Sequence, residues 1–126
     1  MRVSPLSSRL AVIVEDEWLV RMEIADNLEA AGWNIEEFSS GEAAMAMLEG
    51  QSAPDLLVTD IRLLGPMSGW EVAKAYRVTW PGIAVIYASA NHPLAEEQVR
   101  DSVFMEKPSK IAELVSTADR LWGANH

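Results

Sequence analysis

One short segment near the middle of the chain most constrains the fold. Residues 56–58 are a continuous apolar run (LLV), and Asp60 follows two positions later. Such a run is typical of a central parallel strand that is covered on both faces. A carboxylate at the end of a buried strand costs desolvation free energy unless its charge is used. Because ligands bind at the carboxyl edge of open α/β sheets, Asp60 is expected to lie at the centre of the functional site.

The residues after Asp60 predict a loop and then a helix. Gly65, Pro66 and Gly69 interrupt the apolar pattern. Ser68 and Glu71 have the S-x-x-E spacing of a capping box, in which each side chain bonds a backbone amide at the start of a helix. The segment therefore has the order strand, acid, loop, helix.

Apolar runs and helical periodicity alternate along the rest of the chain. Ser39 and Glu42 predict a second capping box, and Gly32 is expected to end the first helix in the C′ position. We expect strands at 10–14, 33–38, 56–58, 83–88 and 103–106, and helices at 18–31, from Ser39 to Gly50, from Ser68 to before Pro81, from Pro93 to about Arg100, and after Ser109. Five strand–helix units with short connections predict an α/β fold, a doubly wound parallel (βα)5 sheet with helices on both faces.

Composition narrows the class of protein. The 126 residues suit one domain, with residues 1–8 as a loosely ordered tail, a folded domain over 9–123 and no output domain. Ten Lys and Arg against nineteen Asp and Glu give a net charge of −9, which argues against nucleic acid or an anionic membrane as partner. No apolar stretch approaches the ~20 residues that span a bilayer. The absence of cysteine excludes thiol chemistry and fits a cytoplasmic protein.

Polar residues follow the strands at one edge of the predicted sheet. Glu15 and Asp16 follow the first strand, Asp60 the third, Ser89 the fourth and Lys107 the fifth. Because the carboxyl ends of parallel strands share an edge, these residues are expected to be neighbours in space. Two carboxylates about 5 Å apart repel by roughly 3 kcal/mol at an effective dielectric constant near 20. Three such groups therefore require protons or a bound cation.

The donor atoms suggest which cation and which chemistry. Carboxylate oxygens suit a hard ion, and Mg²⁺, which retains several waters and often contacts phosphate, fits best. Lys107 and Ser89 would supply the positive charge and the hydroxyl donor that a phosphoryl group needs. Asp60 could then act as a carboxylate nucleophile that forms an aspartyl phosphate.

Several segments together resemble a known family. They are VIVEDE (12–17), LLVTDIRL (56–63), GPMSGWE (65–71), VIYASA (85–90) and FMEKP (104–108). In this order and spacing the chain resembles the receiver domain of two-component response regulators, the CheY-like domains, over nearly its whole length. The resemblance implies a flavodoxin-like sheet with strand order 2-1-3-4-5.

The resemblance also implies the ligands of the site. Asp60 matches the aspartate that accepts the phosphoryl group. Glu15 and Asp16 match the acidic pair that holds Mg²⁺, and the backbone carbonyl of Arg62 matches a further metal ligand. Arg62 stands where small-molecule phosphatases with an aspartate nucleophile commonly need a second Asp, which counts against that enzyme class.

Three further residues match parts of the family's switch. Ser89 matches the residue whose hydroxyl turns toward the phosphoryl group, and Lys107, before Pro108, matches the lysine that bonds to it. Phe104 matches the aromatic residue that moves between exposed and buried positions. Each also has a structural reading: Ser89 as an ordinary strand-end serine, Lys107 as a turn residue and Phe104 as a core aromatic. Likewise, the acids at 15–17 could merely cap a helix N-terminus.

Some positions depart from the family pattern. The loop from Asp60 to Gly69 is one residue longer than in the commonest receivers, and Leu64 stands where the long version usually has proline. Arg62 and Asn91 occupy the positions on which the lifetime of the phosphoryl group depends, so this lifetime is not carried over. Trp18 and Trp70, which follow the two acidic strand ends, are candidates for the pocket rim, whereas Trp33 and Trp122 are expected in or near the core.

The resemblance implies a stand-alone receiver that is a switch and not an enzyme. A histidine kinase or histidine phosphotransfer protein would donate the phosphoryl group, and an unknown downstream protein would read the result. Receivers often dimerise through the last helix, so a homodimer stays open. The main alternative is an adaptor that binds partners without phosphorylation; a small aspartate-nucleophile phosphatase is a weaker one.

Overall fold

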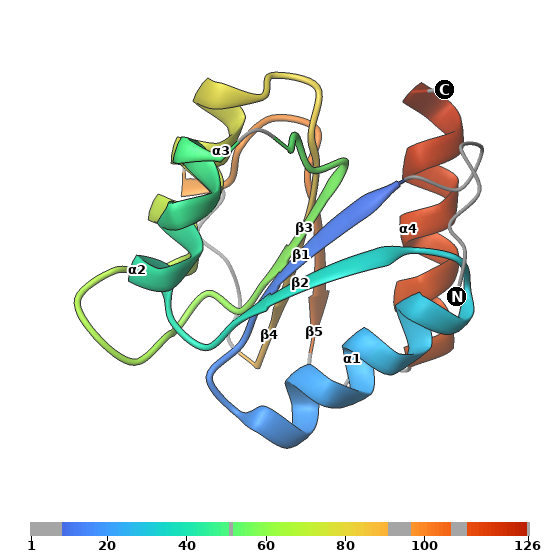
Figure 1. The fold of residues 1–126 in the computed structure, drawn as a ribbon, viewed down its shortest axis with the longest axis horizontal. Helices are drawn as coiled ribbons and strands as arrows, with labels where there is room; N and C mark the ends of the chain where they lie inside the picture. The colour runs from blue at the N-terminus through green and yellow to red at the C-terminus, as the bar shows by residue number, and fades with distance from the viewer. Residues whose placement is uncertain (1–8, 51, 91–96, 107–110, 126) are drawn as a thin grey trace.

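The computed structural model describes residues 9–50, 52–90, 97–106 and 111–125 (Figure 1). In chain order the elements are β1 (Leu10–Val14), α1 (Trp18–Ala30), β2 (Asn34–Phe38), α2 (Gly41–Ala44), the 3₁₀ helix η2 (Met45–Glu49), β3 (Leu56–Thr59), α3 (Gly69–Thr79), β4 (Ala84–Ser89), β5 (Val103–Glu106) and α4 (Ile111–Asn125). The strands form one parallel sheet in the order β2-β1-β3-β4-β5. This is the flavodoxin-like α/β fold expected from the sequence. Among the described residues, no helix combines the length and the apolar character needed to cross a membrane.

The sheet lies between two layers of helices, with α1 and α4 on one face and α2 and α3 on the other (Figure 1). Alternate residues of each strand point to opposite faces. In β1, Ala11 and Ile13 pack in the α1 and α4 layer, whereas Val12 and Val14 pack in the α2 and α3 layer. Both faces are therefore apolar, which explains why the central strands have continuous rather than alternating hydrophobic sequences.

The sequence signals at two helix ends are confirmed. Gly32 follows the end of α1 with a φ of +99°, a left-handed conformation that glycine adopts without steric cost. Ser68 caps α3: its hydroxyl accepts from the amide of Glu71, while the Glu71 carboxylate accepts from the amide of Ser68. This capping box fixes where α3 begins relative to the preceding loop.

The capping box predicted from Ser39 to Glu42 is wrong. Ser40 is the N-cap of α2, and its hydroxyl accepts from the amide of Ala43 at 3.1 Å. The Glu42 carboxylate instead accepts from the backbone amide of Met67 at 3.1 Å, in the loop before α3. A tertiary partner thus takes the side chain that the local pattern assigned to the cap.

Two other element boundaries differ from the prediction. Trp33 was expected in the second strand, but β2 begins at Asn34. The Trp33 indole is buried and donates to Asp119 at 3.0 Å. Of the helix expected from Pro93 to about Arg100, residues 93–96 lie outside the described residues, Glu97 has a 3₁₀ conformation, and residues 98–100 are not helical. There, the amide of Val99 donates to the Tyr87 hydroxyl at 3.1 Å rather than to a helical carbonyl.

Arg9 lies between two tryptophans at the amino end of the sheet and connects the strands there to α4. The Arg9 guanidinium lies 4.6 Å from the ring centroid of Trp33 and 5.4 Å from that of Trp122. It also pairs with Asp119 at 3.1 Å. The cation–π contacts and the ion pair connect β1, the start of β2 and α4. Trp33 is in the core and Trp122 packs at its edge, as expected.

Candidate functional site

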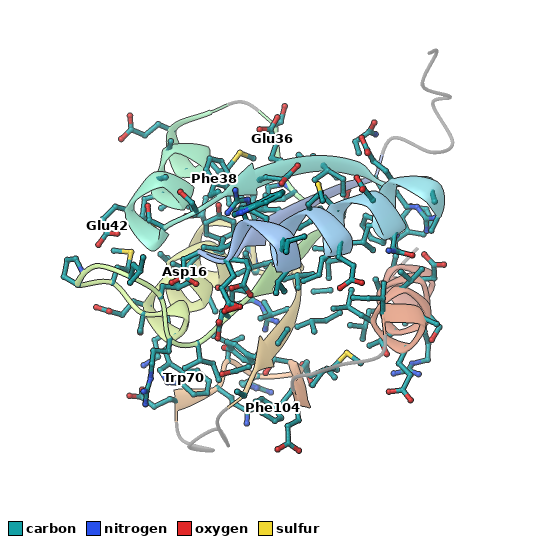
Figure 2. The ribbon with its side chains drawn as sticks, turned by 90° about the horizontal axis from the view of Figure 1, so that it is seen from below. Asp16, Glu36, Phe38, Glu42, Trp70 and Phe104 are labelled. Atoms are coloured by element: carbon teal, nitrogen blue, oxygen red, sulfur yellow. The ribbon has the colours of Figure 1, made fainter. Side chains whose placement is uncertain are left out.

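The acids that follow β1 and β3 lie together, as the sequence predicts. Carboxylate oxygens of Glu15, Asp16 and Asp60 all lie within 4.8 Å of one another. Glu15 is buried, with 2% of its surface exposed, whereas Asp16 and Asp60 are half-buried. Figure 2 views the molecule from the side of the carboxyl ends of the strands, with Asp16 near the middle. Three carboxylates at one edge of a parallel sheet form the strongest candidate site in the described part of the chain.

The sheet itself sets the spacing of these acids. The amide of Glu15 donates to the carbonyl of Phe38 at 3.0 Å, and that of Asp60 donates to Val14 at 3.0 Å. Ladder hydrogen bonds therefore continue one residue past the strand ends. Because neighbouring parallel strands are about 4.8 Å apart, residues fixed in this way bring their carboxylates within reach of one ion.

Arg21 fixes the backbone of Glu15, a role that we did not predict. Its Nη1 donates to the Glu15 carbonyl at 2.6 Å, and its Nε lies 3.4 Å from Oε1 of Glu37. The Glu15 side chain is held separately, because its Oε2 accepts from the amide of Glu17 at 3.2 Å. A sequence signal existed: Arg21 is the one Lys or Arg in α1, and it lies six residues after Glu15.

Asp60 is held by its immediate neighbours. Its Oδ1 accepts from the amide of Arg62 at 3.3 Å, and its backbone carbonyl accepts from the Thr59 hydroxyl at 2.8 Å. The hydrogen bond from the Arg62 amide therefore orients the Asp60 carboxylate. The assignment of the Arg62 carbonyl as a metal ligand stays a prediction.

The loop from Ile61 to Ser68 returns the chain to Asp60. The amide of Gly69 donates to the carbonyl of Ile61 at 2.8 Å, which closes the loop. Gly65 has a φ of +93°, and Leu64 has 71% of its surface exposed. The Glu42 carboxylate holds the loop at Met67. Sequence reasoning missed this role of Glu42, since nothing local connects the two segments.

The structure places Ser89 and Phe104 but does not describe Lys107. Ser89 is the last residue of β4, is fully buried and lies opposite Glu106 of β5. Lys107 lies outside the described residues. Phe104 is half-buried and lies opposite Tyr87. The switch roles of all three residues stay predictions.

Trp70 and Tyr87 form an aromatic pair on the α2 and α3 face of the sheet. Their ring centroids are 4.8 Å apart, and Phe104 packs in the same cluster (Figure 2). Burial raises the pKa of the Tyr87 hydroxyl. Trp70 thus packs against the core on this face of the sheet and is not an exposed residue at the rim of a pocket. Trp18, in contrast, has 62% of its surface exposed.

Comparison with known proteins gives one consistent result. The family model of the response regulator receiver domain matches residues 11–119. A crystal structure of a response regulator receiver protein from Sinorhizobium medicae superposes with a TM-score of 0.90 and 32% identity, and the match covers 96% of this chain and 99% of that one. The receiver domain of the hybrid histidine kinase CckA superposes with a TM-score of 0.77 and 26% identity over 90% of this chain and 98% of that one.

Curated relatives include both large and small proteins. The sensor kinase CckA of Brucella abortus is 29% identical over 90% of this chain, which spans only 12% of that protein's length. The response regulator receiver protein CpdR of Brucella abortus is 25% identical over 87% of this chain, and here the match spans 93% of the relative. The fold and the family model agree, and the chain belongs to the response regulator receiver domain family.

Proposed function

We propose that this protein is a phosphorylation switch that accepts a phosphoryl group on Asp60 from a histidine kinase or a histidine phosphotransfer protein. The observation that carries the proposal is the meeting of Glu15, Asp16 and Asp60 within 4.8 Å at the carboxyl edge of the sheet. Membership of the receiver family supports it. The protein then acts by changing its contacts with other proteins and not as an enzyme with its own substrate.

Mg²⁺ fits the donor set of the site. Receiver domains generally bind Mg²⁺ at an acidic site, and this cluster consists of carboxylates with one buried member, Glu15. We assign Glu15, Asp16, Asp60 and the carbonyl of Arg62 as its ligands. When bound, the ion would offset the repulsion between the Asp60 carboxylate and an incoming phosphoryl group.

The transfer is a displacement at phosphorus. An Oδ atom of Asp60 forms the new bond to phosphorus while the bond from phosphorus to the donor's histidine nitrogen breaks. The electron pair of the broken bond stays on the imidazole, which is neutral once it holds one proton. Lys107 is proposed to pair with the phosphoryl oxygens, and Ser89 to donate its hydroxyl to one of them. The bond from the Arg62 amide keeps Asp60 Oδ1 in place before transfer.

The conformational response to phosphorylation is proposed to start at Ser89. A buried hydroxyl that turns toward the phosphoryl group leaves space near β5, and Phe104 is proposed to move into it. The surface around β5 and α4 would then change for a downstream protein, which the sequence does not identify. A homodimer through α4 is one form that this response could take.

Exposed apolar residues near the site favour a protein donor over a small molecule. Trp18 and Leu19, which directly follow the acids of the β1–α1 connection, have 62% and 60% of their surfaces exposed. Exposed large apolar side chains beside a reactive group are typical of protein-binding surfaces.

The match to CpdR supports a stand-alone receiver, because it spans 93% of that relative's length. A location in the cytoplasm is part of the same proposal. The absence of cysteine is in keeping with the same location. The larger relatives, such as the sensor kinase CckA, extend well beyond the part that this chain spans.

Intact mass spectrometry tests the proposal. The purified protein is incubated with Mg²⁺ and a small-molecule phosphodonor, beside Asp60→Asn and the control Asp26→Asn, which removes an exposed carboxylate on α1. We expect one phosphoryl group on the wild type and on the control, none on Asp60→Asn, and none without Mg²⁺. A histidine kinase replaces the small-molecule donor if the latter fails. Failure with both donors, together with no Mg²⁺ binding, would contradict the proposal and favour the phosphorylation-independent adaptor.

A further inference from the structure

A hollow in the surface lies at the end of α3 that is far from the acidic site. It has a volume of about 690 Å³ and runs between the last turns of α3 and the segment that leads into β5. Figure 1 shows that segment, in orange, beside α3. We call this hollow the α3 groove. It is lined chiefly by Lys74, Arg77, Val78, Pro81, Val99 and Arg100.

Contacts between separate elements hold the walls of the α3 groove. Lys74 Nζ lies 2.6 Å from the Glu97 carboxylate, and Arg77 Nη1 donates to the carbonyl of Arg100. From the sheet, the Tyr87 hydroxyl accepts from the amide of Val99. Three tethers from α3 and β4 fix one short segment, so the groove is preformed. A preformed site requires little ordering when it binds a ligand.

The charge of the α3 groove is opposite to that of the whole protein. The chain has a net charge of −9 and ten Lys and Arg, three of which line this groove. Glu97 balances Lys74, so Arg77 and Arg100 are the cations that remain, and Asp101 is the single acid among the lining residues. Arg77 Nε is buried without an acceptor among the described residues, and its Nη1 donates to the Arg100 carbonyl.

Apolar side chains form the rest of the α3 groove. Val78 has 83% of its surface exposed, the largest fraction for a bulky apolar residue in the described part of the chain. Pro81 and Val99 lie along the same lining. Arginines next to exposed apolar residues match a ligand that combines carboxylates with an apolar side chain.

We propose that the α3 groove binds an acidic peptide segment of a partner protein, with carboxylates beside Arg77 and Arg100 and an apolar side chain against Val78 and Val99. The net charge of −9 disfavours an acidic partner on the surface as a whole, so local cations such as these would orient it. The same net charge excludes nucleic acid as the occupant. This binding does not require phosphorylation of Asp60, so either proposal can fail without the other.

Amide chemical shifts of the ¹⁵N-labelled protein test this inference. The probe is an acetylated, amidated hexapeptide of alternating Glu and Leu, and the control peptide has Gln in place of each Glu. We expect shifts at the amides of residues 74–78 and 98–101 with the acidic probe, weaker binding at higher salt, and little change with the neutral control. Arg100→Gln, at an exposed position, should raise Kd by roughly two- to fivefold, the range for an exposed ion pair.

Arg120→Gln is the matched control, because it removes an exposed arginine from α4. It should leave Kd unchanged. Shifts confined to other surfaces, equal binding of the neutral peptide, or no shift at millimolar probe would each overturn the proposal. Shifts in the α3 groove that depend on protein concentration without peptide would instead identify a second copy of this chain as the occupant.

Discussion

A Cβ atom on Gly69 would lie 1.9 Å from the backbone oxygen of Asp60. The first residue of α3 and the candidate phosphoryl acceptor therefore touch through their backbones. Ser68 fixes the start of α3 from one side, and the bond from the Gly69 amide to Ile61 closes the loop from the other. The position of Asp60 thus depends on a residue nine positions later that has no side chain.

Replacing Gly69 should displace this contact. Gly69→Ala is expected to lower the free energy of unfolding by about 1–3 kcal/mol, because the neighbour is backbone and cannot rotate away. Urea denaturation measures the loss. Gly123→Ala is the control: its Cβ would meet nothing within 4 Å, and helical alanine should stabilise by about 0.5–1 kcal/mol. Equal stability of Gly69→Ala and the wild type would contradict the contact.

Removing one charge from the acidic cluster should stabilise the metal-free protein. Asp60→Asn relieves repulsion among three carboxylates that lie within 4.8 Å. We expect a gain of about 1–3 kcal/mol in unfolding free energy without Mg²⁺. Added Mg²⁺ should stabilise the wild type more than the variant, because ligand binding to the folded state raises its stability. A loss of stability without Mg²⁺, or equal responses to Mg²⁺, would argue against a cation site.

Arg21 should contribute to stability through the Glu15 carbonyl more than through Glu37. Arg21→Met removes the 2.6 Å bond to that carbonyl and should cost about 1.5–3 kcal/mol, the range for hydrogen bonds to charged groups. Glu37→Gln removes only a partly exposed ion pair and should cost at most about 1 kcal/mol. Urea denaturation of both variants compares the two. A larger effect of Glu37→Gln would reverse the assignment.

Alkaline pH should destabilise the protein through its buried tyrosines. Burial raises the pKa of Tyr76, whose hydroxyl donates to the Ala44 carbonyl at 2.6 Å, and it also raises the pKa of Tyr87. Above an unfolded-state pKa of about 10, the unfolded chain loses the phenolic protons while the folded protein keeps them, so stability falls as pH rises.

The slope of unfolding free energy against pH identifies the tyrosine that is responsible. Each such tyrosine contributes up to about 1.4 kcal/mol per pH unit above that pKa. Tyr76→Phe should be less stable at neutral pH, because it leaves the buried Ala44 carbonyl without this donor, but its stability should fall less steeply with pH. Urea midpoints across the alkaline range measure both effects. An unchanged slope in Tyr76→Phe would show that another group titrates.

The sequence predicted that the three acids would meet, because they follow strand ends. Glu15, Asp16 and Asp60 each come one or two positions after an apolar run, and a parallel sheet must bring such positions to one edge. The Ser68–Glu71 capping box was predictable for a related reason: its hydrogen bonds join residues three positions apart. Hydrophobic periodicity, strand ends and local caps are set by neighbouring residues.

Contacts between distant segments needed the tertiary structure. Glu42 bonds the amide of Met67 instead of a helix cap, Val99 donates to Tyr87 instead of forming a helix, and Arg21 holds the Glu15 carbonyl. In each case a polar group had several possible partners of similar hydrogen-bond strength. Packing determined which of these partners lay within hydrogen-bonding distance. The sequence alone determined the fold and the acids at its edge; the folded arrangement decided which side chains hold those acids and where the α3 groove forms.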